Sequence, residues 1–411
     1  MPNMTIGDIL LRSQGSIKTG PFGTKLAARE YSNRGAPVIS VGEIGYGRIT
    51  VTDRTKRVGT DVTDRMPEYL LKAGDIVFGR KGGVDRSAWV RPHEEGYFLG
   101  SDGIRLRFGQ RVDSRFMAYQ FQTPRVRNWL LQHAIGTTLP SLNEPTLRAV
   151  PVELPSFPVQ RSISATLGSL DSKIESGERA VGLLRELVQL QFRRILENEH
   201  YALVPLAELA SIVKGRSYKS AELQPSPTAL VTLRSVDRNG GYREDGLKPY
   251  VGPFKPEQVV CGGEVVVAQT DLTQGAEVVG RAVRVPPISQ FETLVASLDL
   301  AIVRPLGSQP IEYLYALLSS EAFRQHCRSH TTGTTVLHLA KDAIPTWRAP
   351  VVSQESQQAY AALVRPLLAR MDVLRDEASR LRDVRDALLP ELLSGRIRVP
   401  EATEAVEEAV G

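Results

Sequence analysis

The chain has 411 residues, of which 42% are hydrophobic and 24% are charged, with a mean hydropathy of −0.17. That length corresponds to two or three domains, and the composition excludes a disordered chain or a small disulfide scaffold. No apolar run approaches the roughly 18 residues needed to cross a membrane, and residues 1–13 lack the features of a signal peptide. With two cysteines, Cys261 and Cys327, we expect a cytoplasmic protein with no membrane partner.

Positive charge is concentrated in the first third of the chain. The formal net charge is +5, and residues 1–150 hold 22 Lys and Arg against 14 Asp and Glu. Residues 400–411 carry four Glu and no basic residue. A basic segment favours a polyanionic partner, because lysines and arginines that neutralise phosphates release condensed counterions. On charge alone, ordinary surface charge is an equally good interpretation.

The sequence repeats itself. A shift of 197 residues places residues 136–142 (GTTLPSL) on residues 333–339 (GTTVLHL), and the match continues to residue 196 without a gap. Upstream the match is looser, with offsets between 189 and 196, and residues 74–77 correspond to 263–266. We therefore predict an internal pseudo-two-fold repeat.

Each half reads as a mixed α/β block followed by a long helix. In the first half we predict strands over residues 37–41 and 75–78, then a helix over 116–133. In the second half we predict strands over 265–268 and 300–303, then a helix over 311–329. Asn-Gly at 239–240 and Asp-Gly at 245–246 suit turns that need positive φ.

The helices that follow the Gly-Thr-Thr segments carry apolar heptads. They begin at Ile163 and Tyr360 and keep the same register, which predicts an intramolecular antiparallel coiled coil. The alternative is two amphipathic helices, each in the core of its own domain. Gly177 and Arg385 interrupt the apolar seam, and the second helix contains prolines at 366 and 390, where we expect kinks.

Motifs for catalysis are scarce. The sequence has no Gly-x-x-x-x-Gly-Lys-Ser/Thr loop, no His-Glu-x-x-His, and no Asn/Asp-Pro-Pro tetrapeptide of the kind with which a DNA methyltransferase holds its target amine. Asp171-Ser172-Lys173 has the spacing of a nuclease motif, but it lies in the heptad helix, where a solvated face is the simpler interpretation. A second histidine–cysteine pair at zinc-binding spacing is missing from the cluster formed by His326, Cys327, His330 and His338. We predict no catalytic residue and no metal site.

The loops suit contact with a nucleic acid. A Gly-rich turn over residues 18–25 has a lysine at each end, and residues 79–83 place Arg80 and Lys81 on a flexible tip. Arginine can contact guanine through two hydrogen bonds, and lysine suits phosphate. In the second half the matching loop begins with Gln269 and Thr270, whose amide and hydroxyl groups can read base edges.

A set of short motifs occurs in a fixed order along the chain: Gly-Pro-Phe-Gly-Thr at 20–24, Gly-Asp-Ile at 74–76, Gly-Thr-Thr at 136–138, Val-Glu-Leu-Pro at 152–155, Gln-Arg-Ser-Ile at 160–163, Leu-Asp-Ser-Lys-Ile at 170–174 and Leu-Leu-Ser-Gly-Arg-Ile at 392–397. With this order and the repeat, nearly the whole chain resembles the specificity (S) subunit of type I restriction–modification systems. The second copy departs from the pattern at 215–218 (Gly-Arg-Ser-Tyr) and at Leu368, which replaces Asp171.

The resemblance implies two target recognition domains, residues 1–155 and 201–350, alternating with helical regions over 156–200 and 351–399. The composition adds an acidic tail over 400–411. It implies a non-catalytic subunit that reads a split site in double-stranded DNA, one half-site per domain. Two methyltransferase (M) subunits would dock on the helices and bring S-adenosylmethionine for adenine methylation, so this chain would hold no cofactor. Restriction (R) subunits that carry motor and nuclease activity are left open.

We therefore predict DNA contacts in the loops of both halves, from Lys18, Lys25, Arg29, Arg80, Lys81, Thr137, Thr138, Lys214, Arg216, Lys219, Gln269, Thr270, Thr334 and Thr335. Two alternatives remain. One is a tandem-domain DNA-binding specificity protein that serves another methyltransferase or a nuclease defence system. The other is a coiled-coil scaffold with no role on DNA.

Overall fold

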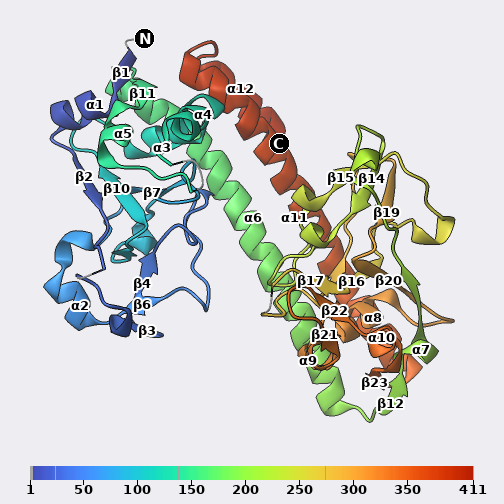
Figure 1. The fold of residues 1–411 in the computed structure, drawn as a ribbon. Helices are drawn as coiled ribbons and strands as arrows, with labels where there is room; N and C mark the ends of the chain where they lie inside the picture. Colours follow the sequence, from blue (N-terminus) through green and yellow to red (C-terminus); the bar gives the residue numbers. More distant parts are fainter. Residues whose placement is uncertain (1–2, 24, 137–138, 274, 411) are drawn as a thin grey trace. The chain divides into compact units, whose positions relative to one another are not determined.

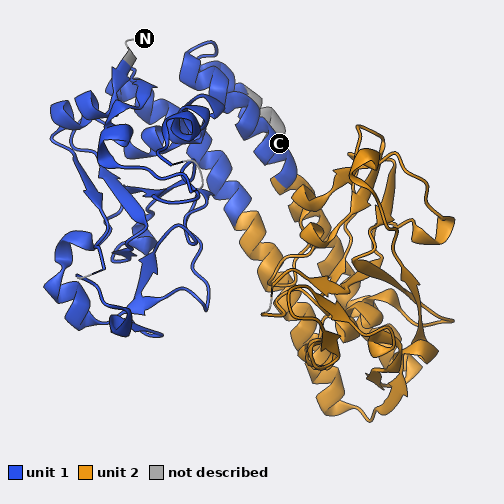
Figure 2. Ribbon diagram, viewed as in Figure 1, with its two compact units in different colours: residues 1–175, 379–411 blue, residues 176–378 orange. Residues whose placement is uncertain are grey.

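The computed structural model of the chain describes residues 3–23, 25–136, 139–273 and 275–410. It divides into two compact units: unit 1 comprises residues 1–175 and 379–411, and unit 2 comprises residues 176–378 (Figures 1 and 2). The two long helices, α6 (Phe157–Asn198) and α11 (Gln354–Ser394), each pass from one unit into the other. Each unit therefore contains part of both long helices.

Unit 1 is built around a five-stranded sheet with the strand order β2-β10-β7-β8-β5. Its first four strands are antiparallel: Ile104 of β10 pairs with Thr19 of β2 on one side and with Phe78 of β7 on the other. The central strand β7 is buried at every position. The strands are β2 (Ser16–Thr19), β10 (Gly103–Arg107), β7 (Ile76–Gly79), β8 (Ser87–Trp89) and β5 (Tyr46–Gly47).

Smaller strands and short helices complete unit 1. A second sheet has the order β3-β6-β4-β9, and β1 pairs with β11. These strands are β3 (Tyr31–Ser32), β6 (Arg57–Val58), β4 (Ala36–Ile39), β9 (Phe98–Leu99), β1 (Asn3–Thr5) and β11 (Pro151–Glu153). The helices are α1 (Ile6–Ser13), α2 (Thr60–Arg65), α3 (Ser114–Gln122), α4 (Pro124–His133), α5 (Glu144–Ala149) and α12 (Val399–Val410).

Unit 2 repeats the sheet of unit 1. Its four-stranded sheet has the order β13-β20-β16-β18, which matches β2-β10-β7-β8 strand for strand. The predicted internal repeat is therefore present in the topology. The strands of unit 2 are β12 (Ala202–Pro205), β13 (Ala210–Lys214), β14 (Thr228–Val231), β15 (Lys248–Pro249), β16 (Val265–Ala268), β17 (Thr270–Asp271), β18 (Ala282–Arg284), β19 (Thr293–Ala296), β20 (Leu300–Pro305), β21 (Thr331–Thr332), β22 (Leu337–Leu339) and β23 (Arg348–Val351).

The helices of unit 2 are α7 (Leu206–Leu209), α8 (Ile311–Leu318), α9 (Glu321–Ser329) and α10 (Ala343–Thr346). The single helices predicted over 116–133 and 311–329 are wrong, because each is two helices. In unit 1 the Thr123 hydroxyl caps α4 by accepting from the Val126 N–H, and Pro124 has no N–H to continue α3. In unit 2 Ser320 caps α9 in the same way.

The long helices α6 and α11 pack together along the predicted apolar heptads. In unit 2 the Tyr360 hydroxyl donates to the Val188 carbonyl at 3.0 Å, and a Cβ at Gly177 would lie 3.6 Å from the Leu374 carbonyl oxygen. Because position 360 meets 188 while 374 meets 177, the helices run antiparallel. Buried seam residues are Ile163, Leu167, Leu170, Ile174, Val188, Tyr360, Val364, Met371, Leu374, Ala378, Leu381, Leu388 and Leu392.

The sequence suggested that Asp171 lies on a solvated face of the heptad helix, and this expectation is wrong. The Asp171 side chain is 21% exposed, and it accepts hydrogen bonds from the Tyr119 hydroxyl at 2.5 Å and from Arg385 at 3.0 Å, all within unit 1. Burial, followed by the neighbouring Asp171 charge, raises the pKa of Tyr119. Arg385 therefore occupies an apolar seam position with a carboxylate partner. Asp171 links the recognition block to both long helices.

Both prolines predicted to kink the second helix lie inside α11, which runs as one helix. The residues of the acidic segment 400–411 that are described lie in α12. Across the described part of the chain, no helix combines the length and the apolar character that a membrane span requires.

Candidate nucleic-acid interface

In unit 1, three loops meet at the end of the five-stranded sheet where β7 finishes. The Arg80 N–H, just past β7, donates to the Asp102 carbonyl at 2.8 Å. The next residue, Lys81, forms a β-bridge with Ser141, and the Gly82 N–H donates to the Pro140 carbonyl at 2.9 Å. Backbone pairing thus ties the predicted cationic loop to the segment that follows the Gly-Thr-Thr motif, although these stretches are about 60 residues apart in the sequence.

The Pro-Phe-Gly turn lies against the same loop. The Arg80 guanidinium sits 4.5 Å from the centre of the Phe22 ring, and one of its N–H groups donates to the Ser101 carbonyl at 3.4 Å. The ring of Phe22 is 54% exposed, and Leu139 on the neighbouring loop is 57% exposed. Exposed apolar groups beside cations, held on a buried sheet, suit contact with both the bases and the backbone of a nucleic acid.

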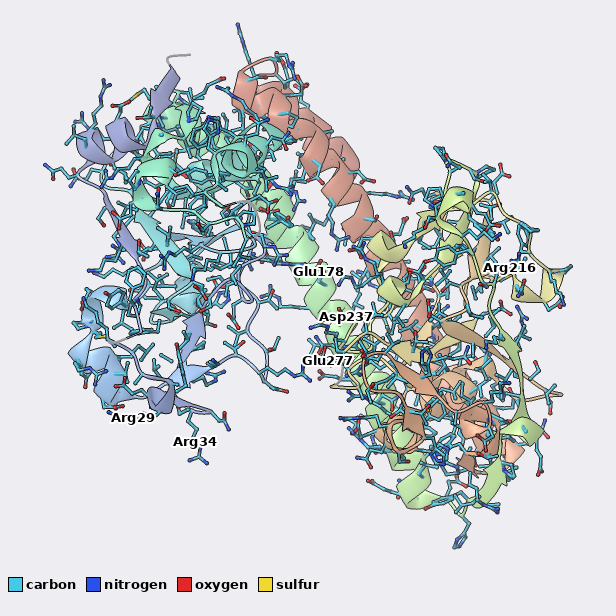
Figure 3. All side chains as sticks on the ribbon, viewed as in Figure 1. Arg29, Arg34, Glu178, Arg216, Asp237 and Glu277 are labelled. Atoms are coloured by element: carbon cyan, nitrogen blue, oxygen red, sulfur yellow. The ribbon has the colours of Figure 1, made fainter. Side chains whose placement is uncertain are left out.

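The remaining predicted residues of unit 1 differ in their surroundings. Lys25 is exposed, and its N–H closes the turn that carries Phe22 by donating to the Phe22 carbonyl at 2.7 Å. Lys18 is half-buried on β2, with its Nζ 5.0 Å from the centre of the Tyr69 ring. Arg29 is exposed in a short 3-10 helix (Ala28–Glu30) at the rim of unit 1 (Figure 3). Predicted contacts from Thr137 and Thr138 lie outside the described residues.

Unit 2 builds the corresponding surface with different side chains. Gln269 follows β16 as Arg80 follows β7; its N–H donates to the Asp299 carbonyl at 2.7 Å and its side-chain amide donates to the Leu298 carbonyl at 3.5 Å. The Leu298 N–H donates to the Arg216 carbonyl at 2.8 Å. Arg216 and Gln269 therefore lie on either side of Leu298. Figure 3 labels Arg216, whose Nε is buried and has no hydrogen-bond partner among the described residues.

The second Gly-Thr-Thr segment also joins this surface. Strand β17 pairs with β22, and β22 pairs with β21, so the turn at 333–336 lies beside the loop that follows β16. Thr334 and Thr335 are exposed in that turn. Thr270 is buried, and its hydroxyl donates to the Asp299 carboxylate at 2.9 Å, so this side chain is committed to the fold. The two lysines at 214 and 219 are exposed.

Asp271 shapes the loop that follows β17. Its carboxylate accepts from the Thr273 N–H and hydroxyl, and from the N–H groups of Val278 and Val279. Burial by itself would raise the pKa of Asp271, but these hydrogen bonds outweigh it and hold the pKa below its usual value of 3.8. The carboxylate therefore stays ionised at neutral pH and holds Thr273, Val278 and Val279 in place through these hydrogen bonds.

Three residues of the histidine–cysteine cluster considered as a metal site lie at the end of α9. The His326 and His330 rings lie 4.2 Å apart, and the His326 Nε2 hydrogen-bonds to the Ala343 carbonyl at 2.9 Å. Cys327 is buried nearby. Within the described ranges, no three His, Cys, Asp or Glu side chains gather where they could hold a metal ion.

Sequence reasoning missed two sets of arginines. In unit 1, Arg127 pairs with Asp85 at 2.8 Å and lies 4.1 Å from the centre of the Tyr46 ring. In unit 2, four arginines from three separate segments line one pocket. No local pattern marks either set, because their members are brought together only by the fold.

Comparison with known proteins agrees with this architecture. Residues 4–181 match the sequence model of the type I restriction modification DNA specificity domain. The type I restriction enzyme MjaIX specificity subunit of Methanocaldococcus jannaschii is 21% identical over 319 residues, which cover 71% of this chain and 70% of that protein. The MjaVIII specificity subunit of the same organism is 24% identical over 151 residues, which span about a third of each protein (36% and 35%).

A solved structure has a similar fold over almost its whole length. The crystal structure of the type I restriction-modification system S subunit from M. genitalium superposes with a TM-score of 0.56 and 15% identity, covering 95% of this chain and 96% of that one. Residues 4–181 thus define the protein as one that carries a DNA specificity domain. That stretch is less than half of the chain; over most of its length the chain is similar in sequence to the MjaIX specificity subunit, and it has the fold of the M. genitalium S subunit.

Proposed function

We propose that the chain is the non-catalytic subunit that reads a bipartite site in double-stranded DNA and directs adenine methylation, and restriction where R subunits are present, by its partners. The observation that carries the proposal is the repetition of one recognition surface. In both units the residues after the third strand of the sheet order pair with residues that follow the Gly-Thr-Thr motif in the sequence, as at Lys81–Ser141 and Thr270–His338. One surface per unit supports one half-site per unit.

The side chains of the two surfaces suit different half-sites. Unit 1 presents Arg80, Lys81 and the exposed Phe22 ring, whereas unit 2 presents Gln269, Arg216 and two exposed threonines. Arginine pairs best with guanine, and glutamine pairs best with adenine. Because each set is held by backbone hydrogen bonds on a buried sheet, its geometry is set before DNA arrives.

The partner methyltransferase subunits would supply S-adenosylmethionine and the transfer of its methyl group to adenine. On this chain the long helices would hold them. Leu183, Leu187 and Leu190 of α6 are exposed at spacings of four and three residues, which places them on one face of the helix. An apolar face of this kind suits a protein partner. Since the proposed substrate is chromosomal DNA, the assembly would act in the cytoplasm.

The direct test is modified-base sequencing of DNA from a host that expresses this chain together with the methyltransferase encoded beside it. We expect methylated adenine in a two-part motif with a fixed gap, and none in a host that carries the methyltransferase alone. A short undivided motif would mean that one unit reads DNA without the other. If a soluble complex forms and methylates nothing, the proposal is wrong, and a specificity protein for another methyltransferase or nuclease system becomes the better interpretation.

A second arm links each unit to its half-site. Replacing Gln269 in unit 2 should change the bases of one half of the motif and leave the other half unchanged. Replacing Arg80 in unit 1 should change the opposite half. A variant that alters both halves together would contradict the assignment of one half-site to each unit.

A further inference from the structure

Unit 2 contains a pocket of about 390 Å³ that is lined by arginines. Arg185 and Arg193 reach it from α6, Arg281 from the segment before β18, and Arg324 from α9. The single acidic residue among its lining residues is Glu186. The four positive charges come from segments spread over 140 residues of sequence, so the fold concentrates them at one place.

The arginines of the pocket are incompletely neutralised. The Nε of Arg324 is buried and has no hydrogen-bond partner among the described residues. A terminal guanidinium nitrogen of Arg324 lies 3.6 Å from a carboxylate oxygen of the 60% exposed Glu321. The Nε of Arg281 donates to the backbone carbonyl of Glu277 at 2.8 Å. Burial first, and then the charge of Arg324, lower the pKa of Arg281 to about 10, although Glu321 and Asp237 act in the opposite direction.

The neighbouring carboxylates have other partners or are exposed: Asp237 accepts from the Asn239 N–H at 2.7 Å, and the Glu321 side chain is 60% exposed. The Glu277 carboxylate pairs with Arg238 at 2.9 Å. Figure 3 labels Glu277 and Asp237 on the side of unit 2 that borders α6. Guanidinium groups held together in a partly buried pocket repel one another, and a bound anion would relieve that repulsion through paired N–H donors.

The internal repeat shows what unit 1 has at the same place. The Gly79 N–H donates to the Arg86 carbonyl at 3.2 Å, and the Ala268 N–H donates to the Arg281 carbonyl at 3.0 Å. Arg281 therefore corresponds to Arg86, and the residue before it, Gly280, corresponds to Asp85. Likewise, Arg324 of α9 and Arg127 of α4 each lie four residues after the cap of their helix.

In unit 1 the arginine pairs closely with a largely buried aspartate, whereas in unit 2 its counterpart, Arg324, contacts the 60% exposed Glu321 at 3.6 Å. Asp85 pairs with Arg127 at 2.8 Å, whereas Gly280 offers Arg324 no carboxylate. Gly280 has a φ of +75°, and a Cβ there would lie 2.3 Å from the Cβ of Cys327. An aspartate is therefore sterically excluded from position 280, so the missing acid is a consequence of how unit 2 is packed.

The helix that borders the pocket follows the same trend. By the shift of 197 residues, Glu186 and Gln189 of α6 correspond to Asp383 and Asp386 of α11, and Arg193 corresponds to a proline. The corresponding positions of unit 1 hold three arginines and three aspartates: Arg86, Arg127, Arg382, Asp85, Asp383 and Asp386. Those of unit 2 hold four arginines and one glutamate. The excess of positive charge is specific to unit 2.

We propose that this pocket binds a phosphate group. Phosphate fits because guanidinium groups donate two parallel hydrogen bonds to its oxygens. The Gly280 N–H donates to the carbonyl of Ala268, and Gln269 of the candidate interface is the next residue. That position favours a backbone phosphate of DNA bound to unit 2, which rests on the proposed function. A free phosphate or a mononucleotide shares the chemistry and is the other source.

The test compares an Arg185→Gln/Arg193→Gln variant with an Arg194→Gln control. Arg193 and Arg194 are adjacent and exposed on α6, but Arg194 does not line the pocket. DNA binding by the complex with the methyltransferase is measured as a function of salt, on a duplex that contains the methylated motif. We expect the salt dependence of the affinity to fall by about one phosphate contact in the double variant and to stay unchanged in the control.

A second variant and a second probe separate the possible outcomes. Gln189→Glu adds a carboxylate to the pocket without removing an arginine, and it should weaken DNA binding in the same direction. Inorganic phosphate and adenosine monophosphate are titrated into the same proteins by calorimetry, with thermal melting as a check on folding. Saturable binding of either one that the double variant loses, with DNA binding unchanged, would assign the pocket to a free phosphate group.

The inference is overturned if the double variant matches Arg194→Gln with all three probes. That result differs from a failure of the proposed function, in which the wild-type complex itself would show no salt-dependent binding to DNA. In that case the phosphate titrations still test the pocket.

Discussion

Lys81 allows the interface to be tested by one change of charge. Its side chain is exposed, while its backbone is held by the bridge to Ser141 and by the adjacent Gly82 N–H, so Lys81→Ala removes a cation and keeps the loop in place. Each phosphate contact contributes about 0.9 to the slope of log affinity against log salt. Between about 50 and 200 mM salt, the wild-type protein should therefore lose roughly 3.5-fold more affinity than the variant.

The measurement is a fluorescence anisotropy titration of a labelled duplex at several salt concentrations. Lys72→Ala is the matched control, because Lys72 is an exposed lysine that lies before β7, at the opposite end of the strand from Lys81. An unchanged slope for Lys81→Ala would remove this residue from the interface. An equal change for Lys72→Ala would show that the effect reports overall charge.

Three further predictions concern the packing of the units. Tyr360→Phe removes the hydrogen bond to the α6 backbone and should lower the free energy of unfolding in urea by about 1 kcal/mol. The control is Tyr201→Phe, which should leave that free energy unchanged because Tyr201 is half-exposed. Equal effects of the two substitutions would contradict the packing of the helices. Burial raises the pKa of the Cys327 thiol to about 12, so a thiol reagent at neutral pH should label exposed Cys261 and reach Cys327 only on unfolding; rapid labelling of both would refute this. Hydrogen bonds outweigh the effect of burial and hold the pKa of Asp85 below 3.8, so its ion pair should stabilise unit 1 above that pH and be lost as the pH falls through the folded-state pKa. The urea midpoint of Asp85→Asn should therefore fall less than that of the wild type as the pH is lowered. Parallel curves of midpoint against pH would argue against the ion pair.

The features of the fold that depend on regular spacing of residues along the sequence were predicted correctly. The heptad spacing that begins at Ile163 and Tyr360 predicted which faces of α6 and α11 are buried, because helical periodicity is written in consecutive residues. The repeat predicted matching halves, and the sheet order confirms it. The break at Thr123 was missed because the residues on both sides follow a helical pattern and the capping hydrogen bond decides where one helix ends.

The candidate site was predicted only in part. The sequence singled out Arg80 and Lys81 as a cationic loop, but it contained no sign that Phe22 packs on Arg80. Thr270 was predicted to face DNA and instead bonds to the Asp299 carboxylate, because pairing of β17 with β22 turns it inward. Whether the exposed residues of these loops contact bases or phosphates stays a prediction.

The repeat, the antiparallel packing of the long helices and the resemblance to specificity subunits could all be predicted from the sequence, since each depends on residue order and spacing within one stretch or its copy. Tertiary structure alone decided the arginine pocket and the ion pair that joins Asp171 to Arg385. The physical reason is that electrostatic interactions depend on distance in space and on burial. Gly280 is an example: the residues next to it in the sequence do not indicate that the Cys327 side chain packs against it and excludes an aspartate from this position.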